Sequence, residues 1–173
     1  MENINFKNLY TFECYDKNGN LKWTEEHSNL VVTQGRNHIL DVAFDEAVQY
    51  GGSGSRWYIG LTGANTVPNA ADTLPSHAGW AEITGAANYP TRQEVLWDSL
   101  SSSATTIDNS DTPVSFSFSS IPSGNTVGGA FLCTSSAGTS GILYGVADFT
   151  GADRAIVQGD VINVVVTIGV TSS

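Results

Sequence analysis

Charged residues are scarce in this sequence of 173 residues, and basic residues are the scarcest of them. Asp, Glu, Lys and Arg together make up 14% of the chain, well below the roughly one quarter usual for soluble proteins. The 7 basic residues are scattered and outnumbered by 17 acidic ones, so that the net charge is −10. An acidic chain without a basic patch repels phosphate groups, so we expect no direct binding of nucleic acid or of anionic membranes.

Cysteine, long apolar runs and a secretory leader are also rare or missing. Cys14 and Cys133 are far apart and match neither a zinc ribbon nor a CxxC redox motif. Each lies in an apolar run typical of a strand, which predicts two buried free thiols. No run approaches the ~20 apolar residues of a membrane span, and the first residues lack the basic and apolar regions of a signal peptide. We therefore expect a soluble product without a membrane partner.

The residues that predominate in place of charged ones favour strands and turns. In the first part of the chain Tyr10, Phe12 and Cys14 alternate with more polar residues, and the later Asn18-Gly19 pair is typical of a tight hairpin turn. These features predict a β-hairpin over residues 9–32.

One helix is predicted, over residues 33–46. Thr33 is a suitable N-cap, and apolar residues follow it at helical spacing. These are Ile39, Leu40, Ala43, Phe44 and Ala47. A single short helix is expected to cover one open end of a sheet.

The rest of the chain is predicted to be β apart from one long segment. Alternation or short apolar runs predict strands at residues 56–61, 114–119, 128–134, 142–149 and 161–170. Short strands between Gly-, Ser- and Asn-rich turns indicate a mainly β fold. The specific prediction is an antiparallel β-sandwich, jelly-roll or Ig-like, with one short α-helix. We expect a single domain over residues 1–173, with the hairpin and helix at 9–47 and a long polar loop at 62–94.

No pattern for catalysis or metal binding is found. The three histidines have no second ligand at metal-binding spacing. The turn at residues 16–20 has its Gly at the fourth position, where a calcium-binding EF-hand loop needs it at the sixth. No GxSxG or phosphate-loop motif is present. We therefore expect a protein that is not an enzyme, with no catalytic residue, no metal ion and no cofactor.

Aromatic side chains leave carbohydrate binding as an alternative. Sugar rings stack on Trp and Tyr, and the candidates are Trp57, Trp80, Tyr89 and Trp97. Trp57 lies in an apolar strand, where filling of the core is sufficient explanation. The other three make a carbohydrate-binding module an alternative function.

The order of these segments resembles that of small structural proteins of tailed bacteriophages. A hairpin leads to the stretch Asn29-Leu30-Val31-Val32-Thr33-Gln34-Gly35, the helix, and the strand Trp57-Tyr58-Ile59-Gly60-Leu61. A polar loop with Asp72-Thr73, the run Gly129-Ala130-Phe131-Leu132, residues 138–143, Arg154, and Gly159-Asp160 before a closing Val/Ile strand complete the order. The resemblance covers most of the chain, and its motifs are structural ones.

The resemblance implies a virion component made in the cytoplasm of a bacterial host. Within virions it favours a capsid decoration (cement) protein, a class whose members are typically jelly-roll or related sandwiches that sit as dimers or trimers across capsomer junctions. The implied partners are the major capsid protein, on the outer capsid surface, and further copies of the chain itself. A tail, neck or fibre-associated protein is the alternative within viruses.

For a decoration protein, contacts are expected from exposed elements rather than core strands. The loop at residues 62–94 comes first, with Trp80, Tyr89 and Arg92 as anchors, because aromatic and Arg side chains dominate interface energetics. An N-terminal arm, residues 1–8 with Phe6, comes second, because free termini often order only on a neighbour. Deletion of residues 70–88 is expected to abolish capsid binding and to leave a folded monomer.

Overall fold

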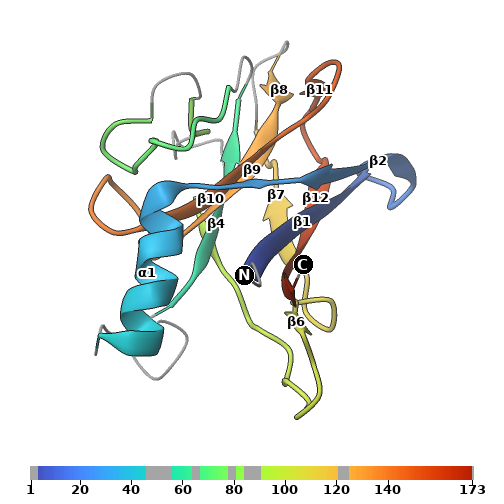
Figure 1. Ribbon diagram of the computed structural model, residues 1–173. Coiled ribbons are helices and arrows are strands. Elements are labelled where there is room, and N and C mark those ends of the chain that lie inside the picture. Colours follow the sequence, from blue (N-terminus) through green and yellow to red (C-terminus); the bar gives the residue numbers. More distant parts are fainter. Residues whose placement is uncertain are drawn as a thin grey trace.

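The computed structural model describes residues 4–45, 56–63, 67–77, 81–83, 91–120 and 125–172. Within these ranges the chain is mainly β, with antiparallel sheets and one helix (Figure 1). The mainly β prediction is therefore confirmed.

The first sheet is built on two strands of 12 residues that lie at opposite ends of the chain. β1 (Ile4–Tyr15) and β12 (Val161–Ser172) pair antiparallel along their whole length. β2 (Leu21–Ser28) pairs with the other edge of β1. The second edge of β12 is shared by β7 (Val114–Ser117) at one end and β6 (Thr106–Ile107) at the other.

A tight turn joins β1 to β2, which confirms the predicted hairpin. The Asp16 carboxylate accepts hydrogen bonds from the backbone N–H groups of Asn18 at 2.8 Å and Asn20 at 2.9 Å. Gly19 takes a φ of 81°, in the left-handed region that glycine tolerates. In the pattern at residues 16–20 that partly resembles a calcium-binding loop, the Asp16 carboxylate thus accepts hydrogen bonds from the turn itself.

The second sheet has shorter strands and follows the order β3-β10-β9-β4-β5. Its strands are β3 (Leu30–Val31), β10 (Leu143–Asp148), β9 (Gly129–Cys133), β4 (Tyr58–Thr62) and β5 (Gln93–Glu94). The prediction that residues 30–32 continue the returning strand of the hairpin is wrong, because the chain leaves the first sheet after β2 and β3 pairs with β10. A small pair, β8 (Thr126–Val127) with β11 (Arg154–Ala155), lies apart from both sheets.

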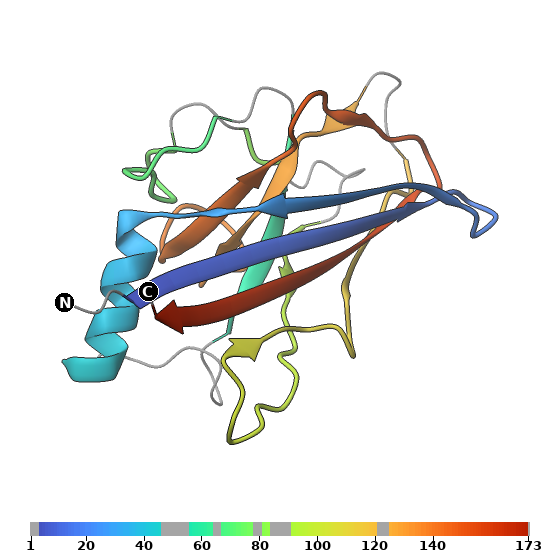
Figure 2. The ribbon, with the colours of Figure 1, turned by 45° about the vertical axis from the view of Figure 1, so that its right-hand side comes forward.

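β1 crosses in front of the strands of the second sheet in Figure 2. Both sheets contribute side chains to one core. Tyr10, Phe12 and Cys14 of β1 are fully buried, as the alternation predicted. They join buried residues of β12 and of the second sheet, among them Ile162, Val164, Val166, Ile59 and Leu132. Both cysteines are buried and free, which confirms the prediction for them.

The helix, α1 (Thr33–Phe44), is present, but its start and its buried face differ from expectation. Its N-cap is Val32 and no side chain caps it, so the prediction of Thr33 as cap is wrong. The buried helical residues are Gly35 and His38, whereas Leu40 is 53% and Phe44 85% exposed. The reason is a close approach: a Cβ on Gly35 would lie 2.3 Å from the Tyr144 carbonyl oxygen of β10. The helix therefore packs through its glycine and leaves Leu40 and Phe44 outside, while Ile39, as predicted, packs against the core.

The expected free N-terminal arm is also wrong for the residues that the structure describes. Residues 4–8 belong to β1 and pair with residues 168–172 of β12, with Phe6 opposite Val170. Phe6 is half-buried as a result. The last strand extends far enough to give these residues a partner within the same chain. Residues 1–3 lie outside the described part.

One buried side chain completes the edge of β12 between β7 and β6. Asn109 is fully buried, and its Oδ1 accepts a hydrogen bond from the Val166 N–H at 2.7 Å. Its Nδ2 donates to the Val164 carbonyl at 3.2 Å and lies 3.4 Å from the Thr112 carbonyl. The amide thus satisfies backbone groups of β12 that no neighbouring strand reaches.

Replacing Asn109 should therefore destabilise the fold. We expect Asn109→Ala to lower the free energy of unfolding by about 2–3 kcal/mol, because buried backbone groups of β12 lose their partners. Urea unfolding followed by tryptophan fluorescence measures this. The exposed neighbour Ser103→Ala serves as control, with an expected change within about 0.5 kcal/mol. Equal stability of the two variants would show that Asn109 does not support the edge.

Candidate functional site

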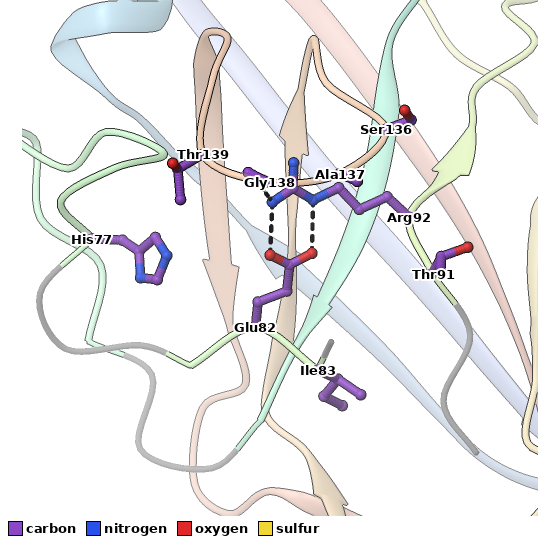
Figure 3. Close-up of a pocket in the computed structure, with 9 residues that line it drawn as sticks. All are labelled: His77, Glu82, Ile83, Thr91, Arg92, Ser136, Ala137, Gly138 and Thr139. Atoms are coloured by element: carbon purple, nitrogen blue, oxygen red, sulfur yellow. Dashed lines mark hydrogen bonds and ion pairs between the residues drawn. The ribbon is translucent and has the colours of Figure 1, made fainter. Parts of the chain in front are cut away.

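A pocket of about 420 Å³ lies on the second sheet where three chain segments meet (Figure 3). The segments are residues 77–83 as far as described, Thr91 with Arg92, and the turn between β9 and β10. Most of the lining residues are small or polar. They are His77, Glu82, Ile83, Thr91, Arg92, Ser136, Ala137, Gly138 and Thr139.

A buried ion pair between Arg92 and Glu82 organises one wall of this pocket. Arg92 Nε and Nη2 each donate to a carboxylate oxygen of Glu82 at 2.7 Å, which makes the bidentate ion pair drawn in Figure 3. Arg92 also donates to the carbonyls of Ser135 at 3.0 Å and Gly138 at 2.8 Å. Its side chain is only 3% exposed, and that of Glu82 14%.

The strands position both partners. Glu82 follows the edge of β4, where Ile83 N–H donates to the Leu61 carbonyl and Gly63 N–H to the Ala81 carbonyl. Arg92 directly precedes β5, and its guanidinium carbon lies 5.0 Å from the centre of the Phe131 ring.

Phe131 reaches this place because of a glycine on the neighbouring strand. A Cβ on Gly60 would come within 2.2 Å of the Phe131 ring. The packing of β4 against β9 thus determines where the guanidinium lies.

The electrostatics of the pair keep Arg92 charged. Burial lowers the pKa of Arg92 and is the largest single influence on it, but the hydrogen bonds and charge interactions with Glu82 and Cys133 together outweigh burial and leave that pKa above its ordinary value. Cys133 Sγ lies 3.6 Å from Arg92 Nη1 and donates to the Ser135 carbonyl at 3.2 Å. Burial raises the pKa of the Cys133 thiol although Arg92 opposes this, which favours the neutral thiol.

In this geometry Arg92 links segments of the chain and does not bind another molecule. Its Nε and both Nη nitrogens are engaged by protein atoms. What the pocket offers a ligand is the hydroxyl groups of Thr91, Ser136 and Thr139, and the His77 imidazole also lines it. In the part of the chain that the structure describes, no group of three or more His, Cys, Asp or Glu side chains is placed to hold a metal ion.

The predicted contact residues are only partly brought together. Arg92 lines the pocket with its charged group turned inward, and Phe6 lies in the other sheet, on β1. Trp80 and Tyr89 lie outside the described residues. Trp57 and Trp97 pack against the core, which confirms the core-filling interpretation of Trp57.

Sequence reasoning missed Glu82 and the β9–β10 turn as parts of this site. One signal for the pair was available, because Arg92 is the only basic residue between Arg56 and Arg154. A lone cation in such a stretch needs a carboxylate partner if it is buried. Sequence did not show which carboxylate that would be.

The structure also corrects the expectation that residues 70–88 can be removed without loss of the fold. Leu74 is 1% exposed and belongs to a core cluster, and Asp72 is 3% exposed. The deletion would also remove Glu82 and leave the Arg92 charge buried alone. We therefore expect it to disrupt folding rather than to leave a folded monomer.

Comparisons with known proteins return no match among family models, curated proteins or solved structures. No helix among the described residues is long and apolar enough to cross a membrane.

The ion pair gives a prediction with an internal control. Glu82→Ala should lower the free energy of unfolding by about 3–5 kcal/mol, because it leaves a buried guanidinium without its counter-charge. Glu94 pairs with Arg56, whose side chain is 56% exposed. Glu94→Ala should therefore cost at most about 1 kcal/mol. Chemical denaturation measures both, and equal losses would contradict a special role for the buried pair.

Proposed function

We propose that this chain is a virion structural protein, a capsid decoration (cement) protein that binds the outer capsid surface. In this proposal its fold is an antiparallel β-sandwich of the jelly-roll or Ig-like type, and it stabilises contacts between subunits of the major capsid protein. The order of segments along the chain supports this proposal. The structural observation that supports it best is the Arg92–Glu82 pair within the loop at residues 62–94.

The pair matters because binding through a loop is costly when the loop must first be ordered. Arg92 connects Glu82 to the β9–β10 turn through Ser135 and Gly138. These bonds hold two points of the segment at residues 62–94, Glu82 and Arg92, in a fixed arrangement with the neighbouring turn. The described residues around these two points are therefore positioned before a partner binds, as a shape-matched contact requires.

The charge distribution fits a protein surface as partner better than a phosphate-bearing one. The β9–β10 turn at residues 134–142 carries no charged residue, and the side chains of residues 134–141 are small or hydroxylated. Such a surface forms contacts through shape and hydrogen bonds with little desolvation of charge. A shell under pressure from packaged DNA is stabilised by each added interface that binds only the assembled state.

Sedimentation of the protein with phage heads tests the proposal. Purified protein added to heads that lack it should sediment with them, in stoichiometry close to that of the capsid protein. Trp80→Ala and Tyr89→Ala should weaken this binding at least about tenfold, as expected for aromatic anchors. Phe44→Ala, on the exposed end of α1, serves as the control that leaves binding unchanged. Occurrence of the protein only in tail fractions would refute the assignment.

A carbohydrate-binding module is the second candidate, and the pocket of about 420 Å³ favours it. The hydroxyl groups of Thr91, Ser136 and Thr139, next to the apolar side chains of Ile83 and Ala137, suit a sugar ring. We expect glycan-array signals, if this function holds, to disappear in Ala137→Trp, which fills the pocket from its exposed rim, and in Trp80→Ala. Trp97→Ala is the comparison, because Trp97 does not line this pocket. Absence of any signal for the wild-type chain would exclude this candidate.

A further inference from the structure

Polar side chains are buried between the two sheets, next to the apolar core. Asn8 is 4% exposed and Tyr10 is fully buried. Both lie on the face of β1 that carries the core, since residues two apart in a strand share a face. Tyr144 of β10, in the second sheet, is 2% exposed and belongs to the same core cluster as Tyr10. Amide and hydroxyl groups from both sheets are thus excluded from solvent.

Asn29 lies where the chain passes from the first sheet to the second, between the end of β2 at Ser28 and the start of β3 at Leu30. Its backbone N–H donates to the Asn8 carbonyl at 2.8 Å. Its side-chain amide lies against β10, because a Cβ on Gly145 would come within 2.5 Å of Asn29 Oδ1. Gly145 therefore leaves room for an amide group on the inner side of the second sheet.

Six polar atoms of these residues are buried and form no hydrogen bond within the part of the protein that the structure describes. They form the buried polar cluster, which consists of the side-chain oxygen and nitrogen atoms of Asn8 and Asn29 and the hydroxyl oxygens of Tyr10 and Tyr144. Buried polar groups in folded proteins are almost always bonded to protein atoms or to ordered water. Because an unbonded buried amide or hydroxyl group is costly, the cluster requires hydrogen-bond partners that the described residues do not supply.

The groups of the buried polar cluster are uncharged. Burial raises the pKa of Tyr10 well above its ordinary value, with the Asn29 side chain opposing this in part, and it raises the pKa of Tyr144 to about 12. Both hydroxyls therefore stay protonated and can donate as well as accept. A buried ion would find no counter-charge among these groups. Water both donates and accepts, and a buried water molecule typically makes about three hydrogen bonds.

We propose that the buried polar cluster is an internal water-binding site, in which about two water molecules bridge β1, the crossover at Asn29 and β10. These molecules supply the donors and acceptors that the amides and hydroxyls lack. They join the two sheets by directional bonds at the point where the chain crosses between them, in addition to the apolar packing nearby. The site goes beyond the proposed function and does not depend on it, because the interior of the protein requires no capsid.

A high-resolution crystal structure of the wild-type chain tests the site directly. We expect ordered water within hydrogen-bond distance of the Tyr144 hydroxyl and of at least one of the two amides. Amides that bond directly to the hydroxyls, with no water among them, would overturn the proposal.

The sign of a stability change gives a second test. Tyr10→Phe and Tyr144→Phe should each lower the equilibrium constant for folding about fivefold, because a bridging water loses one partner. Removal of a hydroxyl without any partner would instead leave stability unchanged or raise it, and that result for Tyr144→Phe would contradict the proposal. Urea unfolding measures the change, and circular dichroism verifies that both variants fold.

Tyr15→Phe is the matched control. The Tyr15 hydroxyl donates to Glu13 Oε2 at 2.6 Å, outside the buried polar cluster. Its removal should change the equilibrium constant for folding by at most about twofold, as is usual for substitutions away from the core. A loss for Tyr15→Phe as large as that for Tyr144→Phe would show that the cluster has no special role. Because no capsid is present in these measurements, failure of the water site and failure of capsid binding are separate results.

Discussion

The full-length antiparallel pairing of β1 with β12 is the interaction on which the rest of this structure depends. It joins the two ends of the chain, from Ile4 opposite Ser172 to Tyr15 opposite Val161. The chain between these two strands is thereby closed into one loop. β2 pairs with the other edge of β1, β6 and β7 pair with the other edge of β12, and the second sheet packs on one face of this first sheet. Such pairing is entropically expensive because its residues are far apart in sequence. It is stabilised by the buried row of aromatic and branched side chains along both strands.

The mismatch in strand length explains two surfaces of opposite character. Where the short strands of the second sheet cover β1 and β12, the inward side chains are fully buried, as for Phe12 and Val164. Where that cover ends, the same inward row becomes exposed without a change in residue type. The buried part of β12 at Val166 and its exposed end at Val170 are thus one face of one sheet, separated by where the neighbouring sheet ends.

Sequence predicted what depends on local pattern. The alternation of Tyr10, Phe12 and Cys14 with polar neighbours identified a half-buried strand, and Asn18-Gly19 identified the turn, because both reflect backbone geometry within a few residues. Sequence did not predict features that depend on contacts with residues far away in the chain. Phe6 belongs to a strand because β12 extends to Ser172, and α1 turns Leu40 and Phe44 outward because Gly35 approaches Tyr144. Neither contact leaves a local signal.

The candidate site illustrates the same limit and explains why a charged pair is used there. A segment as poor in large apolar residues as 62–94 cannot be ordered by burial alone. Replacing a buried ion pair by apolar side chains is often neutral or stabilising, so the pair is not needed for stability as such. What Arg92 contributes is direction: its planar group satisfies two carboxylate oxygens and two carbonyls in one arrangement. An apolar contact would tolerate several positions of Arg92 relative to Glu82 and the β9–β10 turn, whereas these directional hydrogen bonds select one.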